Sequence, residues 1–125
     1  MKSLYVAFGG ALGAVSRYVI SKFINSSFSF SFVPWGTIFV NVVGSFLLSF
    51  LMFLSISKTD ISQSFILFFG TGFLGAFTTF STFAYEFLSI FLTQPLRATV
   101  YFIANIFLGF FAAILGMFLG RGRIL

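Results

Sequence analysis

Four apolar stretches, each about 20 residues or longer, account for most of this chain. They cover residues of about 4–24, 35–57, 65–92 and 97–119. A helix of about 20 apolar residues is long enough to cross the hydrocarbon layer of a bilayer, and a helix satisfies its own backbone hydrogen bonds there. The connections between the stretches are too short to form a second domain. The sequence therefore predicts one all-α membrane domain over residues 1–125, with four transmembrane helices.

The composition agrees with a bilayer as the surrounding solvent. Hydrophobic residues make up 59% of the chain and charged residues 7%, whereas an average soluble domain carries about 25% charged residues. The chain has no Cys and no His, and its acids are Asp60 and Glu86. These counts exclude thiol nucleophiles, thiolate or imidazole metal sites and Ser-His-Asp catalysis within the chain. We expect a protein that is not an enzyme.

The cations are scattered along the chain, so the net charge of +5 does not indicate a nucleic-acid partner. Single cations at the ends of spans commonly reach lipid headgroups. Four crossings place Lys2, Lys58, Arg121 and Arg123 on one side of the membrane, and Lys22 and Arg97 on the other, with Arg17 near this second group. So small a bias allows insertion in both orientations, although a weakly specified single topology stays open.

Polar side chains recur at helical spacing within two spans. The second span carries Thr37, Asn41, Ser45 and Ser49, and the fourth carries Tyr101, Asn105 and Gly109. Residues four apart lie on one helical face. A lone hydroxyl can bond its own helix backbone, but the amide of Asn41 needs a partner on another helix or water. Polar groups inside a span are costly and are therefore functional candidates.

The third span is unusually long and is poor material for a continuous helix. Three glycines, Gly70, Gly72 and Gly75, precede a run rich in hydroxyls, Thr78, Thr79, Ser81 and Thr82. Glycine and β-branched residues disfavour a helix. We therefore predict two half-helices joined by an irregular break between Gly75 and Thr79. Such a break must be buried in protein or line a polar cavity, and it exposes carbonyls that can coordinate a cation.

Two phenylalanines stand out among the 23 in the chain. Phe80 and Phe83 are three residues apart and interrupt the hydroxyl run, so they lie on one helical face. An aromatic ring has a positive edge. Ring edges pointing into a narrow path would help to coordinate a small anion without a fixed cation.

These residues resemble the small fluoride channels called Fluc, also named CrcB. The resemblance is carried in the first span by Gly9-Gly10-Ala11-Leu12-Gly13-Ala14 with Arg17, and in the second by Trp35-Gly36-Thr37 with Asn41. In the third span it is carried by Gly72-Phe73-Leu74-Gly75-Ala76-Phe77-Thr78-Thr79-Phe80-Ser81-Thr82-Phe83, followed by Glu86. The resemblance extends over essentially the whole chain and is weakest in the fourth span.

The resemblance implies a passive channel that exports fluoride across the cell membrane. It implies an antiparallel homodimer whose subunits insert in opposite orientations and form two pores. It also implies one structural sodium ion at the dimer centre, bound by backbone carbonyls that correspond to Gly75 and Thr78. The residues expected along the fluoride path are Asn41, Thr79, Phe80, Ser81, Thr82, Phe83 and Glu86, with Tyr101 and Asn105 as the expected contribution of the fourth span. Arg17 is expected near the vestibule.

Two other functions remain open from the residues alone. A small dual-topology exporter of cationic compounds needs a membrane-embedded carboxylate that exchanges protons, and Glu86 is the candidate. A subunit that only packs against a partner would need neither the amide nor the hydroxyl run. The near absence of acids and bases favours a passive conduit over a proton-coupled pump.

Overall fold

The computed structural model describes residues 1–28, 33–58 and 60–122, and these residues form an all-α fold. Four helical segments in this part of the chain are long and apolar enough to cross a membrane, at Lys2–Ser27, Trp35–Ser57, Gln63–Phe91 and Pro95–Arg121. The elements are α1 (Lys2–Ser27), α2 (Trp35–Ser57), α3 (Gln63–Phe65), η1 (Ile66–Leu74), α4 (Gly75–Phe77), α5 (Ser81–Phe91) and α6 (Pro95–Arg121). The four predicted spans are confirmed.

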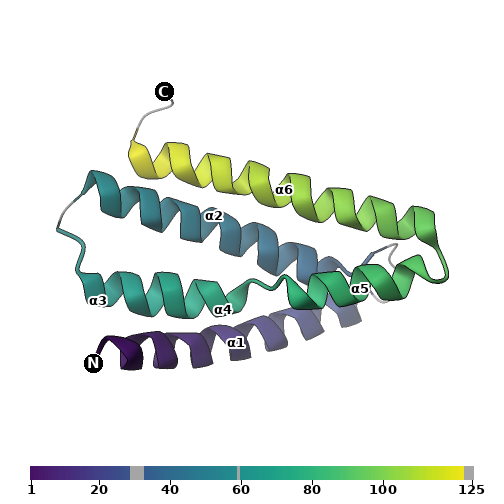
Figure 1. The fold of residues 1–125 in the computed structure, drawn as a ribbon, viewed down its shortest axis with the longest axis horizontal. Coiled ribbons are helices and arrows are strands. Elements are labelled where there is room, and N and C mark those ends of the chain that lie inside the picture. The colour runs from purple at the N-terminus through teal and green to yellow at the C-terminus, as the bar shows by residue number, and fades with distance from the viewer. Residues whose placement is uncertain (29–32, 59, 123–125) are drawn as a thin grey trace.

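The helices lie side by side as two neighbouring layers (Figure 1). One layer holds α2 and α6, and the other holds α1 and the segmented third span. The start of α1 and the end of α6 lie at the same end of the bundle, as four crossings require. This arrangement brings Lys2, Lys58 and Arg121 to one end of the bundle, and Lys22 and Arg97 to the other. Arg123 lies outside the described residues.

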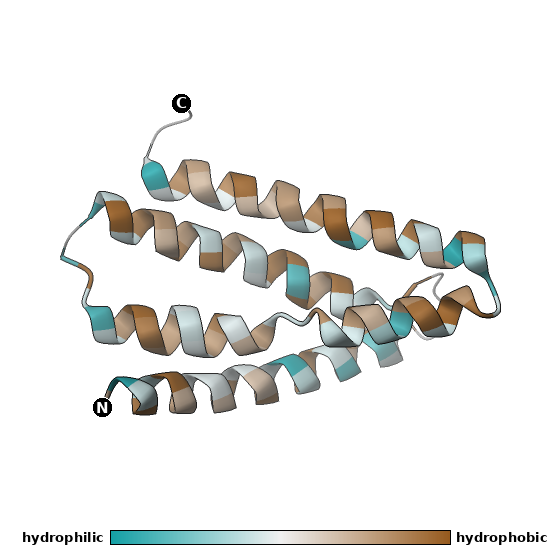
Figure 2. Ribbon diagram, viewed as in Figure 1, coloured by the Kyte–Doolittle hydropathy of each residue, from teal (hydrophilic) through white to brown (hydrophobic). Residues whose placement is uncertain are grey.

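The exterior of the bundle is apolar over most of its length. Figure 2 shows brown and pale colours along the helices, with teal concentrated toward the ends and at a few places between. Large apolar side chains such as Phe8, Leu47, Phe107 and Phe110 are exposed, whereas soluble monomers rarely expose large continuous apolar patches. The protein is therefore a multi-pass membrane protein, in which the hydrocarbon of the bilayer or another protein covers this surface.

Close backbone contact holds α2 against α6. A Cβ atom added at Gly116 would lie against the backbone of Phe46 and Phe50, and one added at Gly120 would lie against the backbone of Phe50 and Leu54. A hydrogen bond also joins the two helices: the Ser49 hydroxyl donates to the Ala113 carbonyl at 2.7 Å. Small residues that let helices approach, with polar side chains between them, are typical of membrane helix pairs.

The predicted break in the third span is confirmed, but it lies at residues 78–80, later than the expected position between Gly75 and Thr79. Gly75–Phe77 still belongs to a short helix, and Thr78 has extended backbone angles, with φ −85° and ψ 159°. The glycines before the break do not unwind the chain. They lie in or beside the nine-residue π-helix η1, a wider helix found often near functional sites.

Candidate functional site at the break in the third span

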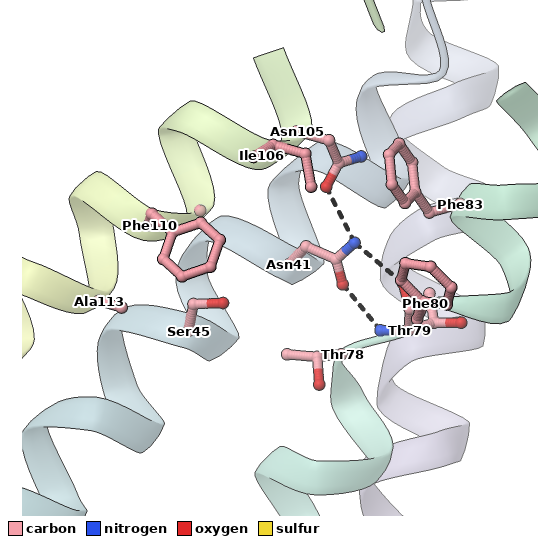
Figure 3. A pocket seen from close by; sticks show the side chains of 11 residues that line it. Asn41, Ser45, Thr78, Thr79, Phe80, Phe83, Asn105, Ile106, Phe110 and Ala113 are labelled. Carbon is pink, nitrogen blue, oxygen red and sulfur yellow. Dashed lines mark hydrogen bonds between the residues drawn. The ribbon is translucent and has the colours of Figure 1, made fainter. Parts of the chain in front are cut away.

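The side-chain amide of Asn41 on α2 holds the break in place (Figure 3). Its Oδ1 atom accepts from the backbone N–H of Thr79 at 2.7 Å, and its Nδ2 atom donates to the backbone carbonyl of Thr79 at 3.0 Å. The same Nδ2 atom donates to Oδ1 of Asn105 on α6 at 3.1 Å. One amide from a continuous helix thus replaces hydrogen bonds that the interrupted backbone cannot make to itself.

The carbonyls of Gly75 and Thr78 are among those at the break that lose the amides a continuous helix would give them. In an α-helix the carbonyl of residue i accepts from the amide of residue i+4, so Gly75 and Thr78 would accept from Thr79 and Thr82. Here the Thr79 amide binds Asn41 instead, and the Thr82 amide donates to Oγ1 of Thr79 at 3.2 Å. The structure therefore leaves these two carbonyl oxygens outside the helical hydrogen-bond pattern.

A cavity of about 270 Å³, which we call the Asn41 cavity, lies between α2, α6 and the break. The lining residues are Asn41, Ser45, Thr78, Thr79, Phe80, Phe83, Asn105, Ile106, Gly109, Phe110 and Ala113. Asn105 is 6% exposed, and its Nδ2 atom has no hydrogen-bond partner among the described residues. Figure 3 shows this nitrogen on the side of Asn105 that faces Phe83. Asn105, one of the residues that line the cavity, therefore has a buried N–H donor without an acceptor among the described residues.

The two phenylalanines of the break differ in their surroundings. Phe83 is 3% exposed and packs edge-on against Tyr101, whereas Phe80 is 75% exposed in the single chain. Their ring centroids are 5.9 Å apart and the ring planes meet at 72°, which is an edge-to-face arrangement. Both rings line the Asn41 cavity, so the pair extends from the core of the subunit to its surface.

Glu86 accepts hydrogen bonds from two buried hydroxyls. Its Oε1 atom lies 2.6 Å from the donor oxygen of Thr37 and 2.7 Å from that of Tyr101, and both residues are almost fully buried. Glu86 also borders a second cavity of about 240 Å³, the Arg17 cavity. The residues that line this cavity are Arg17, Tyr18, Ser21, Lys22, Asn25, Thr37, Thr79, Thr82 and Glu86. Thr79 lines both cavities, so the break lies between them.

The structure brings most of the expected site residues together. Five of them line the Asn41 cavity: Asn41, Thr79, Phe80, Phe83 and Asn105. Arg17, Thr82 and Glu86 line the Arg17 cavity, and Tyr101 donates a hydrogen bond to Glu86. Ser81 and Gly75 are exposed and line neither cavity.

Three further residues of the site were not assigned a role from the sequence. Thr37 binds Glu86, and Ser45 and Gly109 line the Asn41 cavity. Their helical spacing was noted in the sequence, but it did not by itself assign them to the site. Each lies four residues from Asn41 or Asn105 and therefore on the same helical face.

Comparison with known proteins shows the family to which the chain belongs. The family model for CrcB-like protein, Camphor Resistance (CrcB), matches residues 4–117. A protein of Thermosipho africanus called "Fluoride-specific ion channel FluC" is 98% identical over 125 residues, which is the full length of both chains. Proteins with the same name from Thermosipho melanesiensis and Thermotoga maritima are 62% and 58% identical. The match to the Thermosipho melanesiensis protein spans both chains completely. The match to the Thermotoga maritima protein spans 97% of this chain and 95% of its relative. The chain therefore belongs to the CrcB-like family.

Proposed function

We propose that this protein is a passive, fluoride-selective ion channel. The observation that carries the proposal is the full-length similarity, up to 98% identity, to proteins named fluoride-specific ion channels. The Asn41 cavity supports it, because its lining combines an amide N–H without an acceptor, hydroxyls and two aromatic rings. Passage of an ion requires no chemical conversion, so this function is not that of an enzyme.

The chemistry of the Asn41 cavity suits an anion that must lose its water and still leave. Conduction requires contacts that are favourable enough for entry and weak enough for exit. Asn105 provides an N–H donor, Ser45 and Thr79 provide hydroxyls, and the edges of Phe80 and Phe83 are positive. Among the described residues, those that line the Asn41 cavity include no cation that would hold the ion too tightly, whereas Arg17 and Lys22 border the other cavity. The proposed path runs past Thr79 toward Thr82 and Glu86.

We propose that two copies of the chain pair in antiparallel orientation and form two pores. Phe80, Ser81 and Gly75 are exposed in the single chain although they belong to the break or adjoin it. A second copy would cover them and complete the path. The small charge bias supports insertion in both orientations. A tag on the C-terminus should be accessible from both faces of intact cells, and a tag found on one face only would contradict the antiparallel pair.

We propose that the carbonyls of Gly75 and Thr78 bind a structural sodium ion between the two copies. Both carbonyls are deprived of their helical amides, and carbonyl oxygen is a suitable ligand for a small hard cation. Two oxygens from each subunit would provide four ligands, and the ion would hold the two breaks together. A high-resolution map of the dimer should contain an ion on the twofold axis. A map with continuous helix across residues 72–83 and no central ion would contradict this site.

The cell membrane is the proposed location, and the fluoride gradient would set the direction of flux. The test uses liposomes that contain the purified protein and are loaded with fluoride, chloride or a lipophilic cation. We expect rapid loss of fluoride without a pH gradient, while chloride and the cation are retained. Loss of the cation in exchange for protons would instead support an exporter that uses Glu86. The bonding of Glu86 to Thr37 and Tyr101 disfavours that function, because the carboxylate is already held by its own subunit.

A further inference from the structure

One face of α1 lies along the first half of the third span. Gly9, Gly13 and Arg17 are four residues apart and share this face. A Cβ atom added at Gly9 would lie against the backbone of Phe68, and one added at Gly13 would lie against the backbone of Phe73. The two glycines therefore let the backbones of α1 and η1 touch, and Arg17 follows one turn later beside α4.

Arg17 donates from Nε to the backbone carbonyl of Ala76 at 3.1 Å. Ala76 lies in the last turn before the break, and its carbonyl would accept from the amide of Phe80 in a continuous helix. Thr78 is extended, so the helix has already ended. The last carbonyls of a helix lack intrahelical partners, and a cation at that end interacts favourably with the helix dipole.

We infer that Arg17 is a positioning residue that caps the half-helix ending at Phe77 and thereby sets where the break begins. The Ala76 carbonyl lies between the carbonyl of Gly75 and that of Thr78 in the chain. Arg17 thus fixes the break from the α1 side, while Asn41 fixes it from the α2 side. The inference rests on the proposed function only in its consequence for fluoride flux, because the bond itself can be measured without transport.

This role differs from that of a vestibule charge that attracts anions. A vestibule charge would be replaced adequately by lysine, since lysine keeps the positive charge. Lysine would not replace arginine in a capping role, because lysine has no N–H group at the position of Nε and carries its charge as a single ammonium. Lys22, which borders the same cavity, provides a matched measure of what removal of one cavity charge does.

The first measurement uses the wild-type protein in bilayers. The sequence contains two Ala-Phe pairs, Ala7-Phe8 and Ala76-Phe77. Carbonyl-¹³C alanine with ¹⁵N phenylalanine therefore gives two resolved signals in a solid-state NMR correlation spectrum. Selective recoupling to arginine ¹⁵Nε should attenuate the Ala76 carbonyl signal and leave that of Ala7 unchanged. Equal behaviour of the two carbonyls would overturn the inference, whatever the transport activity.

The second measurement compares Arg17→Lys, Arg17→Gln and Lys22→Gln in the same spectrum and in fluoride efflux from liposomes. Both Arg17 variants should move the Ala76 carbonyl signal while the Ala7 signal stays in place, which also reports that α1 is folded. Both should lower the efflux rate by at least about tenfold, and by more than Lys22→Gln does. An unmoved Ala76 signal, or Arg17→Lys with wild-type efflux, would overturn the inference. If wild-type protein releases no fluoride, the proposed channel function fails, and the NMR contact still decides the role of Arg17.

Discussion

The polar face of α2 serves two neighbours in two different ways. Toward its C-terminal half, Ser49 donates a single hydrogen bond to a carbonyl of the continuous helix α6. Eight residues earlier on the same face, Asn41 hydrogen-bonds to both the amide and the carbonyl of Thr79 and also to Asn105. The first contact adds to a helix pair that glycines already bring together. The second replaces backbone hydrogen bonds that the interrupted third span cannot make to itself.

Polar residues at the same helical spacing therefore have two effects. They can add a bond between two continuous helices, or they can hold a broken backbone and leave some of its carbonyls without helical partners. Along α2 and α6 every residue of the contact remains helical, and the serine bond only supplements it. At residues 78–80 the amide of Asn41 takes the Thr79 N–H away from Gly75, and the hydroxyl of Thr79 takes the Thr82 N–H away from Thr78. We expect substitutions at the break to alter flux and substitutions along α2 and α6 to alter stability.

The largest effect on flux is expected for Asn41→Leu. This change removes all three hydrogen bonds that Asn41 makes, each worth about 1 kcal/mol net. If the loss of these bonds raises the barrier to conduction by the same free energy, at about 1.4 kcal/mol per tenfold change in rate, fluoride efflux from liposomes should fall about a hundredfold. Ser49→Ala, on the same helical face, should stay within about twofold of wild type. Similar losses in both variants would remove the distinction between the two contacts.

A smaller loss is expected when the aromatic pair loses its rings. Phe80→Ile and Phe83→Ile keep apolar bulk but remove the positive ring edge, so each should lower fluoride efflux by at least about tenfold. Phe83 is buried against Tyr101, whereas Phe80 is exposed in the single chain. Phe83→Ile should therefore also lower the unfolding temperature more than Phe80→Ile does. Phe53→Ile, outside both cavities, is the control, and wild-type efflux in both members of the pair would show that their rings do not line the path.

The smallest effect on flux per folded molecule is expected along α2 and α6. In Gly116→Ala the new methyl group would meet the backbone of Phe46 and Phe50, which cannot move aside alone. Overpacking of this kind costs about 1–3 kcal/mol, so the unfolding temperature in detergent should fall. Gly109→Ala is matched to it, because a Cβ atom at Gly109 has no neighbour within 4 Å. Equal unfolding temperatures for the two variants would contradict the close contact between these helices.

Much of the fold could be predicted from the sequence, because long apolar runs leave a chain few alternatives in a bilayer. The second span is the clearest example, since its predicted range of 35–57 coincides with α2 (Trp35–Ser57). The position of the break was harder to predict. Glycine favours irregular backbone when considered residue by residue, but here Gly70 and Gly72 lie in a π-helix. Gly72 packs on the backbone of α1 and Gly70 on side chains of α2. Tertiary contact with α1 and α2 outweighed local preference.

The sequence indicated many residues of the candidate site, but it did not indicate which hydrogen bonds join them. Helical spacing placed Thr37 and Asn41 on one face, and Tyr101 and Asn105 on another. Spacing within one helix does not say which helices face each other, so the bond between Thr37 and Glu86 needed the structure. The role of Arg17 shows the same limit. The family resemblance implied a place near the vestibule for Arg17, whereas its contact with the Ala76 carbonyl depends on the path of the broken third span.

Electrical recording from a planar bilayer tests passive, fluoride-selective conduction most directly. The purified protein is placed between two solutions that have equal chloride concentrations and a tenfold difference in fluoride. A fluoride-selective channel should give a current that reverses near the fluoride equilibrium potential, about 59 mV in magnitude for a tenfold gradient of a singly charged ion. A current that reverses near zero, or that follows an imposed chloride gradient instead, would contradict the proposed function.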